Sequence, residues 1–155
     1  MHRALAFALS LLAVLALVRL TATAAPSGRA LDVTDSGQLL GGRRVSMNST
    51  ADQPITMRSD RFIIRRIVVC NRSGTVTSAV GGIYTAPAKG GAALVPNTQV
   101  YSALDTAAKF VDLTLAAALS TQVVTTSPLY FSLTTPQGSA GQADVYIIGD
   151  DVDRD

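Results

Sequence analysis

From Arg43 onward the chain consists of short segments rich in Val, Ile, Thr, Tyr and Phe, separated by turns of Gly, Pro, Asn and Ser. Many short apolar segments with frequent turn signals are typical of an antiparallel sandwich or barrel. We therefore predict an all-β protein, an antiparallel β-sandwich of the jelly-roll or Ig-like type. The predicted strands are Arg43–Met47, Pro54–Met57, Phe62–Asn71, Val76–Thr85, Thr98–Ala103, Phe110–Leu115, Gln122–Thr126, Leu129–Thr134 and Ala143–Ile148.

The alternation of apolar and polar residues indicates which side chains face the core. Leu129, Phe131 and Leu133 alternate with more polar neighbours, so they should share one buried face. The segment Val145–Ile148 is apolar at every position, as expected of a central strand or of a strand covered by another subunit. The pair Gly81-Gly82 interrupts a strand-like run and predicts a bulge or a close backbone approach.

The stretch between Leu104 and Leu119 fits two patterns. Its apolar residues match a helical stripe that Asp105 could cap. However, Phe110–Leu115 alternates cleanly between apolar and other residues, as a strand does. We predict a strand there and leave a short helix near Ala116–Leu119 open.

The first 25 residues differ in composition from the rest of the chain. A basic start at His2-Arg3 precedes a mostly apolar run, and an Ala-x-Ala site at Ala22 and Ala24 follows. This order is typical of a secretory signal peptide. Arg19 lies between the run and the site, which leaves three interpretations: a cleaved signal peptide, an uncleaved anchor, or a true translation start near Val18. The run is shorter than the about 20 apolar residues of a membrane span, so no stable membrane association is expected.

The remaining 130 or so residues correspond to one folded domain. Residues 26–42 are polar and contain several glycines, which predicts an extended, flexible N-terminal arm. The sandwich is expected over residues 43–149. Residues 150–155 contain four Asp, and because they lack a glycine turn or a Glu for a hard cation, we expect a solvated acidic tail.

The composition excludes most catalytic chemistry. The only His is at position 2, the only Cys is Cys70, and the chain has no Glu and no Trp. Nucleophiles of the Ser-His-Asp or Cys-His kind would lack their base in the folded part, and one Cys excludes a disulfide framework or a multi-Cys metal site. We expect Cys70 to be a buried free thiol. No catalytic residue, cofactor or metal is expected, and so no enzyme.

The densest charge feature is a set of arginines, Arg58, Arg61, Arg65, Arg66 and Arg72. Arg65 and Arg66 are consecutive in a predicted strand, so they should point to opposite faces. Because an unpaired charge is strongly unfavourable in a dry core, at least one of them must be exposed or paired. Pairing with Asp60, Asp112 or Asp144 is one interpretation, and contact with a partner is another. Nucleic-acid binding is not expected, since neither lysines nor stacking aromatic residues accompany the arginines.

A similar overall sequence character extends over roughly residues 46–151, and it is clearest in the segments Arg65–Asn71, Gly81–Ala86, Lys109–Leu115 and Leu129–Thr134. In this overall character, and not in any single motif, the chain resembles the small β-sandwich virion proteins of tailed bacteriophages, in particular capsid decoration or cement proteins. The resemblance implies a non-enzymatic protein at the capsid surface that stabilises the shell by binding across subunits of the major capsid protein. It also implies dimers or trimers, with residues 26–42 as an arm that ties neighbours together.

Interface residues are expected among the arginines and tyrosines, because both residue types are enriched at interface hot spots. For each tyrosine, a core position at the edge of the sandwich is the alternative. The expected interface residues are Arg58, Arg61, Arg65, Arg66, Arg72, Tyr84, Tyr101 and Tyr130.

The leader favours a second class of function, because phage capsid components assemble in the cytoplasm. An exported bacterial β-sandwich would be secreted or periplasmic, as an adhesin, a pilus-like subunit or a periplasmic binding module. A strand-exchange subunit would expose an unpaired hydrophobic edge, and the arm could serve as its donor strand.

Overall fold

The computed structural model describes residues 37–117, 119 and 121–152. The predicted leader, most of the predicted arm and residues 153–155 of the predicted tail lie outside this part. The described residues form two four-stranded antiparallel sheets and no helix, so the all-β prediction is confirmed. The strands are β1 (Gln38–Ser46), β2 (Gln53–Ile55), β3 (Phe62–Gly74), β4 (Val80–Ala86), β5 (Gly90–Val95), β6 (Val111–Asp112), β7 (Leu129–Thr135) and β8 (Gly141–Asp151).

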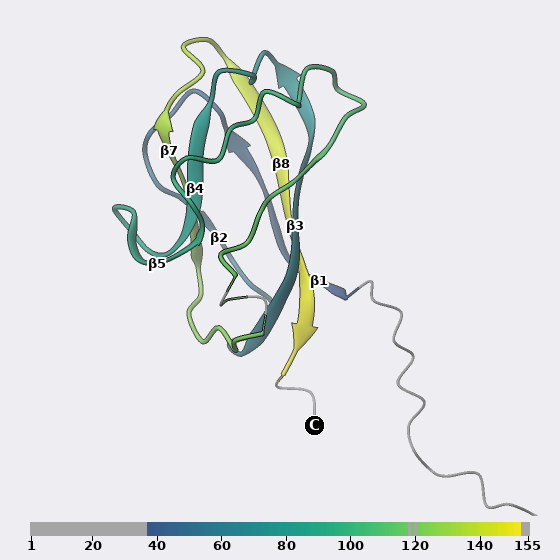
Figure 1. Ribbon diagram of the computed structural model, residues 1–155, viewed down its shortest axis with the longest axis vertical. Helices are drawn as coiled ribbons and strands as arrows, with labels where there is room; N and C mark the ends of the chain where they lie inside the picture. The colour runs from purple at the N-terminus through teal and green to yellow at the C-terminus, as the bar shows by residue number, and fades with distance from the viewer. Residues whose placement is uncertain (1–36, 118, 120, 153–155) are drawn as a thin grey trace, which may run out of the picture. The chain divides into compact units, whose positions relative to one another are not determined.

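The two sheets face each other as the layers of a sandwich (Figure 1). Sheet A has the strand order β1-β8-β3-β6, and sheet B has the order β2-β7-β4-β5. In sheet A the 11-residue β8 is central and pairs with β1 on one side and with β3 on the other. Its apolar segment Val145–Ile148 therefore belongs to a central strand, which is one of the two alternatives that the sequence offered.

The core lies between the sheets and is built from alternate residues of each strand. Leu129, Phe131 and Leu133 of β7 are fully buried, which confirms the face predicted for them. On the opposite side of this core, Ile147 of β8 in sheet A is also buried. Branched and aromatic side chains fit this pleated, close-packed layer, because their stiff rotamers cost little entropy to order there. The bulge predicted at Gly81-Gly82 is present as a register shift between β4 and β7.

Three of the predicted strands are wrong or much shorter. Thr98–Ala103 and Gln122–Thr126 contribute only isolated bridges through Val100 and Val124. Of Phe110–Leu115 only the two residues of β6 pair with β3. These segments are apolar because loop residues such as Tyr101 insert into the core, not because their backbones belong to a ladder.

β5 is a strand that the sequence analysis missed, since its residues GGAALV lack β-branched side chains until Val95. A tight hairpin tip joins β4 to β5. Ala88 and Lys89 have positive φ values of 57° and 58° there. The stretch left open for a helix near Ala116–Leu119 contains a turn, in which the Leu119 amide donates to the Ala116 carbonyl at 2.8 Å.

Both predicted boundaries of the sandwich also shift. β1 begins at Gln38, so residues 38–42 of the predicted arm belong to sheet A, and β8 continues to Asp151. The glycines that suggested a loop are needed for close packing. A Cβ at Gly41 would lie 2.9 Å from the Met57 sulfur, and one at Gly42 would lie 3.0 Å from the Tyr146 ring.

Tyr101 is the largest fully buried side chain in the described part of the chain. Its hydroxyl donates to the Gly81 carbonyl at 3.2 Å, and its ring centroid lies 6.0 Å from that of Phe131. Burial, with a smaller contribution from Tyr84, raises the pKa of the Tyr101 hydroxyl above its ordinary value. The folded protein therefore keeps this proton at a pH where the unfolded chain releases it.

We expect the free energy of unfolding to fall as the pH rises above about 10, by up to about 1.4 kcal/mol per pH unit for Tyr101. Tyr101→Phe should flatten this dependence and cost about 1 kcal/mol at neutral pH, because the hydrogen bond to Gly81 is lost. Urea denaturation between pH 8 and pH 11 measures both effects. Tyr130→Phe, a half-buried position, is the control. A variant Tyr101→Phe with an unchanged alkaline slope would contradict the assignment.

Candidate functional site

A β-bulge in β3 places two arginines on the outer face of sheet A. The inward residues Ile64 and Ile67 are buried, and the register with β8 shifts between Ile64 and Arg66. Arg65 and Arg66 both lie between these inward residues and are both exposed. The prediction that the two arginines point to opposite faces is therefore wrong. A bulge adds one residue to a strand and so breaks the alternation of its faces.

Apolar side chains occupy the middle of the same outer face. Tyr146 and Ile148 of β8 are half-buried and alternate with inward Val145 and Ile147. Their neighbours across the ladders are Val68 of β3 and Leu39 of β1, with Ile63 of β3 further along. Leu39 is 38% exposed. We call this set the apolar band; its members are Leu39, Ile63, Val68, Tyr146 and Ile148.

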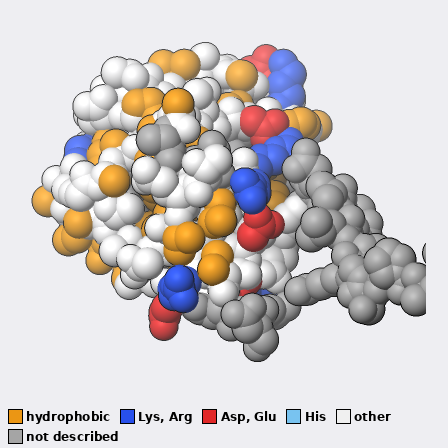
Figure 2. All heavy atoms as spheres, turned by 60° about the horizontal axis from the view of Figure 1, so that its bottom comes forward, with side chains coloured by type: hydrophobic (Ala, Val, Ile, Leu, Met, Phe, Trp, Pro, Cys, Tyr) orange, Lys and Arg blue, Asp and Glu red, His pale blue; other side chains and the backbone are white. Residues whose placement is uncertain are grey.

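Three arginine–aspartate pairs flank the apolar band. The Arg44 Nη1 lies 3.0 Å from the Asp144 Oδ1, and the Arg65 Nη2 lies 2.7 Å from the Asp150 Oδ2. Charges of opposite sign also lie next to each other on the surface in Figure 2, with hydrophobic side chains beside them. The third pair joins Arg66 to Asp112 of β6, which is one of the pairings that the sequence predicted.

The Arg66–Asp112 pair is bidentate. The Nε and Nη2 atoms of Arg66 donate to the two oxygens of Asp112 at 2.5 and 2.8 Å. The hydrogen bond and charge of Arg66 hold the pKa of Asp112 below its ordinary value, against a smaller effect of desolvation. The Arg66 guanidinium carbon also lies 5.8 Å from the ring centroid of Phe110, a side chain that is 57% exposed. Arg66 thus links β3 to the segment that carries β6.

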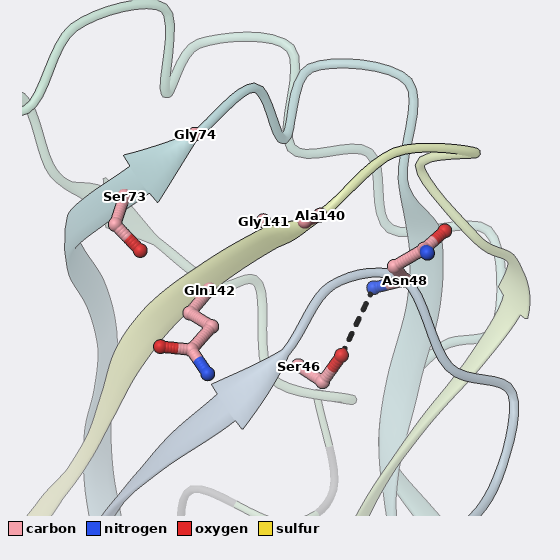
Figure 3. Close-up of a pocket in the computed structure, with 7 residues that line it drawn as sticks. All are labelled: Ser46, Asn48, Ser73, Gly74, Ala140, Gly141 and Gln142. Carbon is pink, nitrogen blue, oxygen red and sulfur yellow. Dashed lines mark hydrogen bonds between the residues drawn. The ribbon is translucent and has the colours of Figure 1, made fainter.

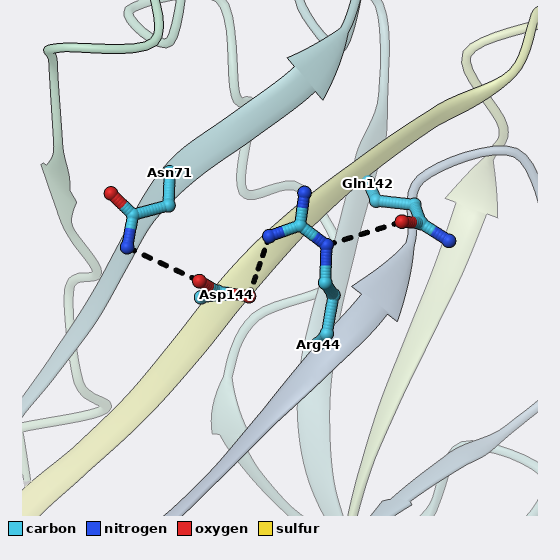
Figure 4. A network of polar contacts seen from close by, with 4 residues as sticks. All are labelled: Arg44, Asn71, Gln142 and Asp144. Atoms are coloured by element: carbon cyan, nitrogen blue, oxygen red, sulfur yellow. Dashed lines mark hydrogen bonds and ion pairs between the residues drawn. The ribbon is translucent and has the colours of Figure 1, made fainter.

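Asp144 on the central strand ties its two neighbours together (Figure 4). It accepts hydrogen bonds from the Arg44 side chain of β1 at 3.0 Å and from the Asn71 side-chain amide of β3 at 3.2 Å. Arg44 also donates through Nε to the Gln142 side chain at 3.1 Å. This network fixes the polar end of the outer face.

Open hollows lie along the outer face, and the two larger ones are similar in size. One, of about 410 Å³, lies beyond the polar network at the end of the ladder and is lined by polar side chains and backbone (Figure 3). The other, of about 420 Å³, lies between β3 and the segment before β6. The first is lined by Ser46, Asn48, Ser73, Gly74, Ala140, Gly141 and Gln142. The second is lined by Arg66, Val68, Cys70, Asn71, Ala107, Ala108, Lys109 and Phe110.

Cys70 is less buried than predicted, because its side chain lies on the outer face of β3 instead of in the core. It is of intermediate exposure, and its ladder partner is Asp144. Desolvation raises the pKa of the thiol, and the charge of Asp144 raises it further. The thiolate is therefore disfavoured, which makes Cys70 a weak nucleophile.

The structure separates the predicted interface residues into four groups. Tyr84 and Tyr101 are buried, with exposures of 4% and 0%, so the interface prediction is wrong for both and the core alternative holds. Tyr130 is half-buried and pairs with Tyr84 in sheet B. Arg65 and Arg66 are brought together on the outer face of sheet A.

The remaining three predicted arginines take other positions. Arg58 and Arg61 are exposed in the connection between β2 and β3. The Arg58 amide donates to the Leu40 carbonyl at 2.8 Å. Arg72 donates to the backbone carbonyls of Gly74 and Asp105, and so it links β3 to the connection between β5 and β6.

Sequence reasoning missed several residues of this face, among them Arg44 and Tyr146. A signal for Tyr146 was present, since Val145–Ile148 is apolar on both sides of a strand. Nothing local marked Arg44, which becomes relevant only through its partner 100 positions away.

Within the residues that the structure covers, no group of three or more metal-ligating side chains is found. Over the same residues, no helix has the length and hydrophobicity needed to cross a membrane.

Arg66→Ala should raise the pKa of Asp112 toward its ordinary value, since Arg66 is the main cause of the shift. The pair favours the folded state above the ordinary pKa of Asp, and this contribution is lost as the pH falls through the lowered folded pKa. The effect on stability should be small and should shrink at high salt, because both partners are about half exposed. Carboxyl NMR titration measures the shift. Arg44→Ala is the control, and an equal shift of Asp112 in both variants would contradict the pairing.

The outer face of sheet A is thus the best-defined candidate site, with paired charges around an apolar band and open hollows along its borders. No protein-family model, no curated protein and no solved structure matches this chain.

Proposed function

We propose that the protein is a non-enzymatic structural component of a bacteriophage virion, a decoration or cement protein that binds across major capsid protein subunits. The observation that carries this proposal is the outer face of sheet A. An apolar band with balanced, paired charges at its borders suits contact with another protein surface. The composition of the chain, with its single His at position 2, offers little for catalysis.

The charge arrangement favours a protein surface as the partner over a highly charged partner such as nucleic acid. Each arginine of the face, Arg44, Arg65 and Arg66, already has an aspartate within 3.0 Å. The face is therefore neutral overall and lacks the excess positive charge that binding to nucleic acid requires. Such pairs can remain at the rim of an interface, where they set orientation, while the apolar band supplies the buried centre.

A decoration protein needs no more than such a face on a stable scaffold. If it binds only across joints of the assembled shell, it stabilises the assembled state by mass action. The sandwich suits this role because the outer face is carried by two long paired strands, the 13-residue β3 and the 11-residue β8.

The second candidate, an exported β-sandwich, takes its support from the leader-like sequence of residues 1–25. A strand-exchange subunit would need an open hydrophobic edge. The edge of β1 that faces away from β8 is bonded instead: Leu40 accepts from the Arg58 amide at 2.8 Å, and the Ser46 amide donates to the Gln53 side chain at 2.7 Å. This favours a face contact over strand exchange.

The test is the N-terminal sequence and intact mass of the protein from its natural source, with its distribution between purified particles and soluble fractions. A start near Val18 and sedimentation with particles would support the proposal. A start at Ala25 and recovery outside the cytoplasm would overturn it in favour of the exported module.

A matched pair of variants sharpens this test. Particles assembled with Tyr146→Arg should carry far fewer copies than the wild type, as counted by quantitative mass spectrometry. Val100→Arg changes an apolar side chain that is 52% exposed but lies outside the outer face. It should leave the copy number unchanged, and equal losses in both variants would count against the face.

A further inference from the structure

We propose that the hollow between β3 and the segment before β6 is a pocket that receives an uncharged apolar side chain from the protein partner. The inference rests on the proposed function only in naming that partner as the source of the side chain. It adds where on the outer face the partner is anchored and which kind of residue anchors it. We call this hollow, of about 420 Å³, the β3 pocket.

The lining of the β3 pocket is mostly apolar. Phe110 is 57% exposed, so a large aromatic surface borders the pocket without cover. Val68 belongs to both the pocket and the apolar band, and apolar surface therefore continues from one into the other. Exposed aromatic surface beside a cavity is typical of interface hot spots. Five of the eight lining residues have apolar side chains: Val68, Cys70, Ala107, Ala108 and Phe110.

Two arginines join the walls of the β3 pocket. One wall is β3, and the other is the end of the connection between β5 and β6. At one end Arg66 binds both oxygens of Asp112 and lies 5.8 Å from the ring centroid of Phe110. Beyond the other end Arg72 of β3 donates to the Asp105 carbonyl. The walls are therefore fixed before a partner arrives, which lowers the entropic cost of binding.

The charges on the lining are already neutralised. Arg66 and Lys109 are the charged residues among those that the structure places on this lining. Arg66 pairs with Asp112 at 2.5 Å. The Lys109 Nζ lies 2.8 Å from the Asp105 Oδ2. A charged side chain would have to displace one of these partners or meet a like charge, whereas an uncharged apolar side chain gains by leaving water.

The other large hollow of the outer face has a different character. Hydroxyl and amide groups line it, from Ser46, Asn48, Ser73 and Gln142 (Figure 3). Such a lining suits polar and water-mediated contacts. Of the two, the β3 pocket is the one suited to an apolar anchor.

Cys70 reports on the occupancy of the β3 pocket. It lines the pocket and is of intermediate exposure. Because it is the only Cys of the chain, a thiol reagent modifies this position alone. A side chain that enters the pocket should therefore slow the modification.

The experiment measures the rate of Cys70 modification in the full chain at one fixed pH, with N-acetyl-phenylalaninamide and N-acetyl-leucinamide as probes. We expect saturable protection, with a dissociation constant on the order of 1 mM. The amides of N-acetyl-aspartate and N-acetyl-lysine, with the same backbone but charged, should protect little. Phe110→Ala should weaken protection by the phenylalanine probe about 10-fold, because an aromatic wall is lost. Val100→Ala, at an exposed apolar position outside the face, is the matched control.

Several outcomes would overturn the inference. They are no protection by the apolar probes, equal protection by the charged probes, or protection that Phe110→Ala leaves unchanged. A modification rate that falls as the protein alone is concentrated would assign the pocket to a second copy and would also overturn it.

Labelled chains separate this inference from the proposed function. Wild type labelled at Cys70 with a bulky maleimide should bind poorly to particles that lack the protein. Cys70→Ser combined with Ser73→Cys moves the same label to the polar hollow and should bind much better. Equal binding of the two labelled chains refutes the pocket and leaves the virion role intact. Protection by the apolar probes in a protein that never sediments with particles supports the pocket and refutes the virion role alone.

Discussion

Gly149→Ala is expected to lower the free energy of unfolding by more than about 3 kcal/mol. Gly149 lies in the central strand of sheet A, opposite the bulge of β3. A Cβ at this position would lie 1.9 Å from the Ile63 carbonyl oxygen and 3.0 Å from the Ile64 Cα. Both are backbone atoms of the neighbouring strand, so no rotamer change can relieve the clash. The β3–β8 ladder must open locally to admit the methyl group.

Urea denaturation followed by circular dichroism measures this effect. Gly138→Ala is the control, because Gly138 has a φ of +83° but no atom within 4 Å of its Cβ position. That variant should lose only about 1 kcal/mol from backbone strain. Equal losses in the two variants would show that β3 and β8 do not approach each other as closely as the structure places them.

The second large effect is expected for Phe131→Ala, which should cost about 3–5 kcal/mol. Phe131 is fully buried between the sheets and packs against Tyr101. Truncation removes its apolar contacts and leaves a cavity that the two sheets cannot close by a small shift, because their backbones are held by ladders on both sides.

Phe110→Ala makes the same chemical change at a side chain that is 57% exposed. It should cost less than about 1 kcal/mol. Thermal and urea denaturation at low protein concentration, where association does not contribute, compare the two. If Phe110→Ala were as costly as Phe131→Ala, the division between core and outer face would be wrong.

Parts of this fold were predictable from the sequence because a buried face imposes a period of two. Leu129, Phe131 and Leu133 show it, and so does the central strand around Val145–Ile148, where both faces are apolar. The period does not distinguish a paired strand from a loop whose side chains insert into the core. Tyr101 is such a residue, and it led to a strand prediction where only a bridge exists nearby.

The candidate site was predictable only in part. The pairing of Arg66 with Asp112 was one of the options that the sequence offered, and it is present. The pairing of Arg65 with Asp150 was not, because Asp150 was assigned to a solvated tail and is instead part of β8. The common orientation of Arg65 and Arg66 depends on a register shift between strands far apart in the sequence. A single strand carries no sign of such a shift.

The register of β1 with β8 has a consequence for engineering the chain. Gln38 lies opposite Gly149, two residues before the end of β8, so the first and last strands meet as neighbours at one end of sheet A. A short linker could join Asp151 to Gln38 and convert the β8–β1 ladder into a hairpin. New ends could then be opened at the exposed turn between β7 and β8, around Gly138. Such a circular permutant would move any fused tag or displayed peptide from one pole of the sandwich to the other while leaving both sheets intact.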